Sequence, residues 1–105
     1  MTSTSEHDRH WSFVTNHARV LAYIAEHPDA RLRDIADAVV ITERTAAQIV
    51  NDLEQAGYLT KTREGRRNRY AIDGRKKLRH PRLKTFAASQ LLALLLETFE
   101  QQPFA

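Results

Sequence analysis

Residues 41–73, ITERTAAQIVNDLEQAGYLTKTREGRRNRYAID, decide how this chain folds. The first half of this stretch predicts a helix over residues 42–56 with a single buried face. Thr42 is a good N-cap for that helix, and Gly57 is a natural left-handed residue to end it. The apolar residues at helical spacing on the predicted inner face are Ala46, Ile49, Val50 and Leu53.

A short basic β-hairpin is predicted directly after this helix. Two runs with alternating apolar residues, 58–63 and 68–72, flank the turn signal at residues 64–67. The hairpin therefore covers residues 58–72.

Three further helices are predicted around this unit. Apolar residues at helical spacing predict one helix within residues 11–27, which Pro28 ends, and a shorter one over residues 31–39. Residues 85–99 are apolar on more than one stripe and predict a last helix. The expected fold is mainly α with a small β-hairpin (α+β), a winged helix-turn-helix with an added C-terminal helix.

The chain of 105 residues is expected to form one domain with a small appendage. We expect a disordered polar tail over residues 1–9, a winged helix-turn-helix DNA-binding domain over 10–74, a basic linker over 75–84 and a C-terminal dimerisation helix over 85–105. The sequence has no cysteine and no apolar run near the roughly 20 residues of a membrane span. A cytoplasmic protein without a membrane partner is the natural expectation.

The net charge of +3 hides a strong asymmetry along the chain. Residues 1–60 carry 5 basic and 9 acidic side chains, whereas residues 61–84 carry 11 basic and only 2 acidic ones. A basic block on a mildly acidic body indicates a polyanionic partner. The alternative is that these charged residues only form a solvated surface, as runs of charged residues usually do.

The outer face of the predicted 42–56 helix suits base recognition. At 100° per residue, Arg44, Gln48 and Asn51 point away from the buried stripe. Arginine pairs well with guanine, and glutamine and asparagine with adenine, whereas Thr45 and the helix N-terminus suit phosphate contacts. The alternative is that any soluble helix has a polar outer face. The basic hairpin that follows favours double-stranded DNA.

Five cations surround the tip of the predicted hairpin: Lys61, Arg63, Arg66, Arg67 and Arg69. They are typical of a wing that contacts the DNA backbone or the minor groove. The alternative is that they keep an exposed edge hairpin soluble.

The last helix is too apolar to lie alone in water. It can pack on this chain's own first helix, or it can form a homodimer interface with the same helices of a second copy. The predicted interface residues are Trp11, Phe13, Phe86, Leu91, Leu92, Leu95 and Phe99.

Nothing in the sequence indicates an enzyme. No nucleophile with its base, phosphate loop or paired-carboxylate site is recognisable, so no catalytic residue and no cofactor are predicted. His7 and His10 could pair on a metal only if their segment were helical, and no metal site is predicted. For His17 we expect a structural or phosphate-contact role. The sequence identifies no small-molecule effector.

LRDIADAVVITERTAAQIVNDLEQAGYL followed by TKTREGRRNRYAI resembles the winged helix-turn-helix core of bacterial regulators of the MarR and ArsR type. The likeness covers roughly residues 11–82 and looks closest to a small, actinobacterial-style subgroup. The resemblance implies a homodimeric DNA-binding transcriptional regulator. It places Arg44, Thr45 and Gln48 at recognition positions and Arg66, Arg67 and Arg69 at wing positions.

This sequence departs from that family where Val40 stands, since glycine often occupies this position before the recognition helix. A β-branched residue disfavours a positive φ, so the turn is expected to open in a different backbone conformation. The leading hypothesis is a sequence-specific regulator of transcription. The alternative is a winged helix that docks an acidic protein partner, and a small hydrolase or transferase is the weakest hypothesis.

Overall fold

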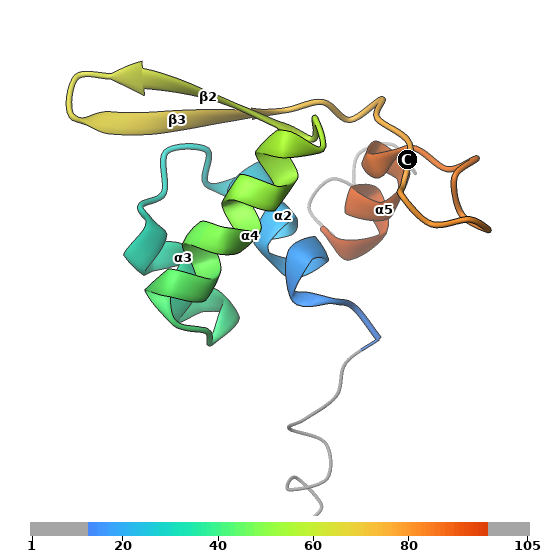
Figure 1. Cartoon of the computed structure of the whole chain (residues 1–105), viewed down its shortest axis with the longest axis horizontal. Helices are drawn as coiled ribbons and strands as arrows, with labels where there is room; N and C mark the ends of the chain where they lie inside the picture. The colour runs from blue at the N-terminus through green and yellow to red at the C-terminus, as the bar shows by residue number, and fades with distance from the viewer. Residues whose placement is uncertain (1–12, 97–105) are drawn as a thin grey trace, which may run out of the picture.

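The computed structural model describes residues 13–96, and within them the elements follow the predicted order (Figure 1). They are α2 (Asn16–Glu26), α3 (Leu32–Val39), α4 (Glu43–Gln55), β2 (Leu59–Glu64), β3 (Arg67–Ile72) and α5 (Ala88–Leu95). This mainly α arrangement with one antiparallel hairpin confirms the predicted winged helix-turn-helix with an added C-terminal helix.

The first described helix is shorter than the pattern in residues 11–27 suggests. Thr15 has an extended backbone (φ −71°, ψ 164°), and its side chain accepts a hydrogen bond of 3.2 Å from the Ala18 amide. Thr15 is therefore the N-cap, and α2 begins at the residue after it. The helix ends at Glu26, just before the proline that was predicted to stop it.

The inner faces of α2, α3 and α4 meet in one hydrophobic core. Val20, Ile24 and Ile35 are its most completely buried large side chains. Full burial of a side chain of this size contributes about 1.5–3 kcal/mol, so these contacts fix the three helices relative to one another. The base of the hairpin and α5 close the core through Tyr58, Leu59, Tyr70, Ala88 and Leu92.

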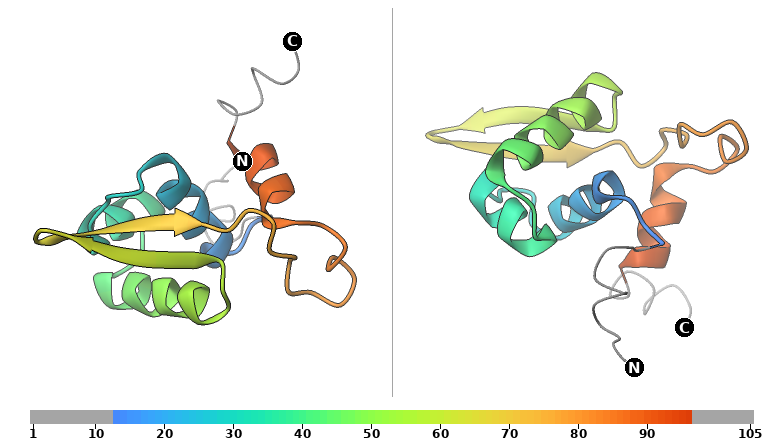
Figure 2. Two further views of the ribbon diagram at one scale, coloured as in Figure 1. Left: turned by 90° about the horizontal axis from the view of Figure 1, so that it is seen from above. Right: turned by 60° about the horizontal axis from the view of Figure 1, so that its bottom comes forward.

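The hairpin projects from this body (Figures 1 and 2). β2 and β3 pair from Leu59 opposite Ile72 to Glu64 opposite Arg67, which leaves Gly65 and Arg66 as a two-residue loop. Gly65 has a φ of +63°, as the first loop position of a type II′ turn requires. At its base the Tyr70 amide donates to the Pro28 carbonyl (2.8 Å), which ties β3 to the α2–α3 connection.

The expectation for the turn before α4 is wrong. Val40 adopts the left-handed conformation (φ 64°, ψ 54°) that a glycine would take there, and its amide donates to the Ala36 carbonyl. The Ile41 amide also donates to Ala36 (2.9 Å). Because α3 and α4 are both anchored in the core, the three-residue connection (40–42) must turn this tightly whatever residue it carries. The turn therefore keeps its conformation, and the backbone of the β-branched residue Val40 is strained.

The predicted start of the last helix is also wrong. Thr85 and Phe86 are not helical, and Ala87 is extended (φ −87°, ψ 157°) and pairs with Lys77 in an isolated antiparallel bridge. The Leu78 amide donates to the Phe86 carbonyl (2.9 Å). Residues 77–87 therefore form a closed loop, and α5 begins only at Ala88.

None of the helices within residues 13–96 is long and apolar enough to cross a lipid bilayer.

Candidate nucleic-acid interface

The two faces of α4 divide as the helical spacing predicts. Ala46, Ile49, Val50 and Leu53 are buried. Arg44, Gln48 and Asn51 are exposed, so their hydrogen-bonding groups are accessible to a partner. Burial of one face fixes the position of the helix relative to the core, as a helix that reads bases requires.

Thr45 is partly occupied by the capping of α4. Its amide donates to the Thr42 hydroxyl oxygen (3.0 Å), and the Thr42 hydroxyl donates to the Thr45 hydroxyl oxygen (3.0 Å). This confirms Thr42 as the predicted N-cap. Thr45 is only half-exposed, so it offers less surface to a partner than Arg44 beside it.

The C-terminal end of α4 closes in a Schellman motif. The Tyr58 amide donates to the Leu53 carbonyl (2.9 Å) and the Gly57 amide to the Glu54 carbonyl (3.0 Å), while Gly57 has the predicted left-handed backbone (φ +90°). The Lys76 side chain packs over this end, where a Cβ on Gly57 would lie 3.4 Å from its Nζ. A cation at a helix C-terminus is favourable to the helix dipole.

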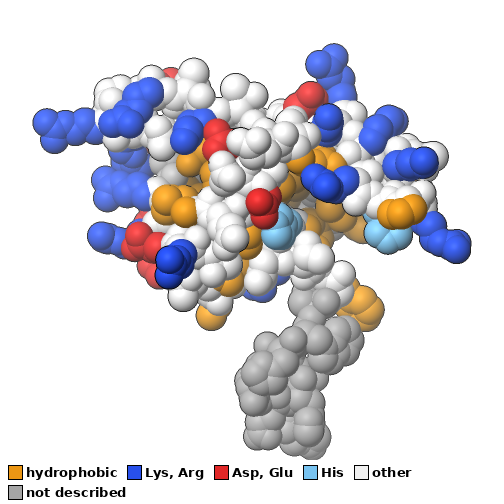
Figure 3. Space-filling view, in the orientation of Figure 1, with side chains coloured by type: hydrophobic (Ala, Val, Ile, Leu, Met, Phe, Trp, Pro, Cys, Tyr) orange, Lys and Arg blue, Asp and Glu red, His pale blue; other side chains and the backbone are white. Residues whose placement is uncertain are grey.

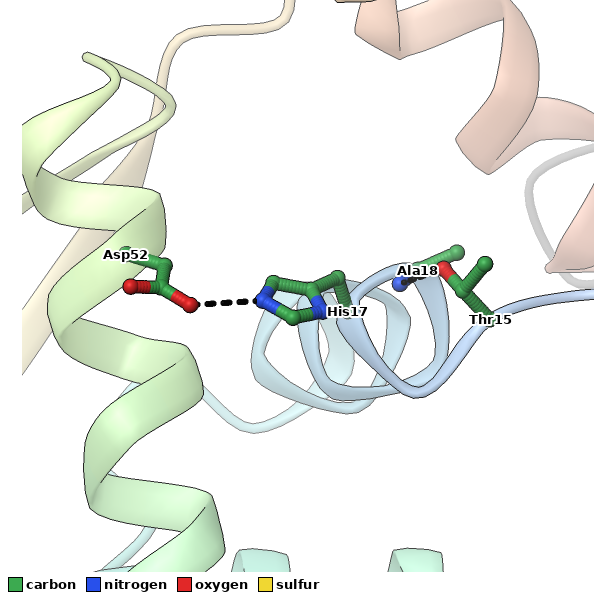
Figure 4. A network of polar contacts seen from close by, with 4 residues as sticks. All are labelled: Thr15, His17, Ala18 and Asp52. Atoms are coloured by element: carbon green, nitrogen blue, oxygen red, sulfur yellow. Dashed lines mark hydrogen bonds and ion pairs between the residues drawn. The ribbon is translucent and has the colours of Figure 1, made fainter.

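A contact between α2 and α4 adds to the support of the exposed helix. His17 Nε2 lies 2.8 Å from Asp52 Oδ2 (Figure 4). The two residues are 35 positions apart, and both side chains are about half-exposed. This supports the structural role expected for His17. Asp52 itself is engaged by the histidine.

The structure separates the five predicted wing cations into two groups. Three have partners: Lys61 Nζ lies 4.0 Å from Glu54 Oε1, Arg63 Nε donates to the Gly65 carbonyl (3.2 Å), and Arg67 Nη2 donates to the Asp29 carbonyl (2.7 Å). Arg66 and Arg69 are exposed and have no side-chain partner within residues 13–96. Sequence reasoning treated all five alike, because nothing in the local pattern shows that Asp29 lies beside the hairpin.

Tyr70 is buried at the base of the hairpin, where its amide contacts the α2–α3 connection. Burial and, secondarily, the nearby Glu54 carboxylate raise the pKa of the Tyr70 phenol above its ordinary value of 10.0, although a hydrogen bond with Asn68 opposes this shift. The phenol therefore stays neutral around pH 7. Glu54 also forms an ion pair with Lys61 (4.0 Å), which links the end of α4 to β2.

Basic side chains gather at both ends of the molecule (Figure 3). One group surrounds the hairpin, and the other covers the loop after it, with α4 between them (Figures 1 and 3). A polar helix face flanked by positive surfaces is the arrangement that a polyanionic duplex would contact.

Comparison with known proteins decides the family. The family model described as "MarR family" matches residues 14–69, which is more than half of the chain. This chain belongs to the MarR family. Members of the family are DNA-binding transcription regulators and not enzymes, as the sequence predicts. The narrower likeness to ArsR-type regulators and to an actinobacterial-style subgroup stays a prediction.

Solved structures of MarR-type regulators share the fold. MepR, a transcription regulator of the Staphylococcus aureus multidrug efflux pump MepA, is 14% identical, with 94% of this chain and 69% of that chain covered and a TM-score of 0.53. PcaV, a transcriptional regulator from Streptomyces coelicolor in complex with its natural ligand, is 25% identical, with 87% and 68% covered and a TM-score of 0.53.

A mutant of S. aureus MepR bound to an oligodeoxyribonucleotide is 17% identical to this chain, with 93% and 68% covered and a TM-score of 0.53. A search of curated protein sequences found no match.

In this MarR-family chain the predicted interface residues differ widely in exposure. Phe13 is 95% exposed and Phe86 is half-exposed, while Leu91 and Leu95 are half-buried. Leu92 is only 5% exposed, because it packs in the chain's own core. Trp11 and Phe99 lie outside the described residues. Leu94, which was not among the predicted residues, is 78% exposed.

A half-open cavity of about 680 Å³ lies beside the His17–Asp52 contact. Its walls come from α2, from the C-terminal half of α4, and from Leu78, Arg79 and Leu91. Within the described part of the chain, no three His, Asp or Glu side chains come together as a metal site would need. His7 and His10 lie outside that part.

Proposed function

We propose that this chain is a sequence-specific regulator of transcription that binds double-stranded DNA as a homodimer. α4 enters the major groove and offers Arg44, Gln48 and Asn51 to base edges, with Thr45 at the margin of the contact. The hairpin is the wing and lies on the flanking backbone or in the minor groove.

The observation that carries the proposal is the way α4 is held. Its N-terminus is capped by Thr42, its C-terminus is closed at Gly57, and Asp52 is joined to α2 through His17. A helix fixed at three points presents its exposed face in one orientation, which lowers the entropy cost of reading bases. The MepR mutant with the same fold was solved on DNA, which supports this use of the fold.

The wing residues have different parts in this proposal. Arg66 and Arg69 are exposed and have no side-chain partner among the described residues, so they can contact phosphates directly. Lys61, Arg63 and Arg67 are each held by an intramolecular contact, so they shape the wing and add positive potential to it.

The homodimer is proposed from the apolar surface that the single chain leaves open. Phe13 and Leu94 are largely exposed, and Leu91 and Leu95 are half-buried on α5. A second copy that covers this surface would pair two recognition helices. Two-fold dimers of such proteins bind half-sites about one helical turn, roughly 34–36 Å, apart.

A binding selection on genome fragments with the purified protein tests the proposal. The expected result is an enriched, inverted-repeat sequence. Replacing Arg44 with alanine should relax the preference at one base pair of each half-site by about 1–3 kcal/mol. The control is Arg19→Ala, since Arg19 lies on α2 and not on α4.

Two outcomes would count against the proposal. If Arg44→Ala selects the same sequence as the wild type with unchanged discrimination, α4 does not read bases through this residue. If the wild-type chain shows no preference for any duplex at low salt but retains an acidic protein partner, the winged helix is a protein-interaction module instead.

A further inference from the structure

The loop between the hairpin and α5 carries the second group of cations. We call residues 75–84 the basic loop; it contains six cations and no acidic residue: Arg75, Lys76, Lys77, Arg79, Arg82 and Lys84. No acidic residue occurs from there to the end of α5 either. The positive charge of this end is therefore not balanced by its own segment.

The first three cations of the basic loop have partners in the fold. Arg75 Nε lies 3.6 Å from Asp73 Oδ1, the Lys76 side chain covers Gly57, and Lys77 Nζ is 3.5 Å from the Thr85 carbonyl. Of these contacts, the one between Lys76 and Gly57 joins the start of the loop to the end of α4.

The remaining three cations are Arg79, Arg82 and Lys84, all of them exposed. None has a side-chain hydrogen bond or ion pair within the part of the chain that the structure describes. Arg79 also lines the cavity beside the C-terminal half of α4, so the group extends from the recognition helix to the tip of the loop.

Backbone contacts hold the basic loop in shape. The Lys77–Ala87 bridge closes its base, and the Tyr58 hydroxyl donates to the Lys77 carbonyl. At the tip the Arg82 amide donates to His80 Nδ1 (3.1 Å), and the Leu83 amide donates to the His80 carbonyl (3.0 Å). The free cations are therefore presented on an ordered turn, as the cations of the wing are.

The basic loop and the wing tip lie at opposite ends of the molecule, with α4 between them (Figure 1). The longest dimension of the chain, 48 Å, runs between these two ends. Seen from above, α4 and the basic loop extend toward the same side of the body (Figure 2, left). A duplex placed along α4 would therefore pass the wing on one side and the basic loop on the other, over more than one helical turn of about 34 Å.

We propose that the basic loop is a second duplex-DNA contact, in which Arg79, Arg82 and Lys84 bind backbone phosphates on the side of α4 opposite the wing. This inference rests on the proposed function. The contact adds affinity and widens the bound site without reading bases, because it depends on phosphate charge. An acidic protein surface is less favoured, since the basic loop extends toward the same side of the body as α4 (Figure 2, left).

The test compares a triple variant, Arg79→Gln with Arg82→Gln and Lys84→Gln, with the wild type on the selected sequence and on a scrambled duplex. The variant should weaken both complexes by the same factor. The salt slope is the slope of the logarithm of the binding constant against the logarithm of the salt concentration. In the variant its magnitude should fall by about 0.9 per lost phosphate contact, or about 2.7 per protomer. Between roughly 50 and 200 mM salt the wild-type protomer should therefore lose about 40-fold more affinity than the variant. Hydroxyl-radical footprints should shorten on the side away from the wing.

Two controls separate a phosphate contact from other effects. The charge-conserving variant, Arg79→Lys with Arg82→Lys, should keep the wild-type salt slope. Arg19→Gln removes one positive charge outside the loop, so it shows the effect of net charge per charge removed. Circular dichroism melting checks that the triple variant is folded.

The inference is overturned if the triple variant keeps the salt slope and the footprint of the wild type. If the wild type still prefers its selected sequence in that case, the proposed function stands. The inference is also overturned if the variant loses binding only to phosphatidylserine vesicles or to an acidic protein. Absence of any duplex preference in the wild type would remove the proposed function and this inference together.

Discussion

Replacing Val40 with glycine should stabilise the protein. A left-handed backbone costs an L-residue about 1–2 kcal/mol, and Val40 has φ 64° and ψ 54°. Glycine removes this strain but widens the unfolded ensemble, which costs about 0.4–1 kcal/mol. The side chain is 82% exposed, so its loss sacrifices little burial. The expected net gain in the free energy of unfolding is about 0.5–1 kcal/mol, equivalent to roughly 2–6 °C in the melting temperature of a domain of this size.

Urea unfolding followed by circular dichroism measures the effect, with thermal melting as a second readout. Val40→Asn should also stabilise, because asparagine tolerates the left-handed region and still carries a side chain. Val40→Ala is the matched control: it keeps the Cβ that causes the strain and should change stability little. The reasoning is refuted if glycine and alanine have the same effect, since the strain would then not depend on the Cβ.

Three further results are expected. Arg67→Ala should lower the free energy of unfolding by about 0.5–1.5 kcal/mol, because it removes the hydrogen bond to the Asp29 carbonyl. Arg66→Ala should leave the free energy of unfolding unchanged and reduce the salt slope of DNA binding, so equal melting curves for the two variants would contradict this. Burial raises the pKa of Tyr70, so the stabilisation tied to its neutral form is complete below the unfolded pKa of 10.0 and is lost as the pH rises through the folded pKa. In urea unfolding, Tyr70→Phe should lack this loss of stability at alkaline pH. Parallel pH profiles of stability for the variant and the wild type would argue against this reasoning. Leu94→Glu should shift the chain from dimer to monomer in sedimentation without lowering the monomer's stability, and an unchanged sedimentation coefficient would remove α5 from the proposed interface.

The sequence by itself determined α4 and its two ends. The buried stripe, the Thr42 cap and the Gly57 closure depend on residues three to five positions apart, so their physical causes are contained in a short segment. The hairpin follows for the same reason, since Gly65 supplies the positive φ that its turn requires. From these local features the fold class and the exposed face with Arg44 could be predicted.

The tertiary structure decided what depends on distant parts of the chain. Arg67 meets Asp29 across 38 positions and His17 meets Asp52 across 35, and no local spacing encodes either contact. The bridge at Ala87 shortened the last helix for the same reason. At Val40 the sequence preference was overruled, because the packing of α3 and α4 in one core contributes more free energy than one strained residue costs.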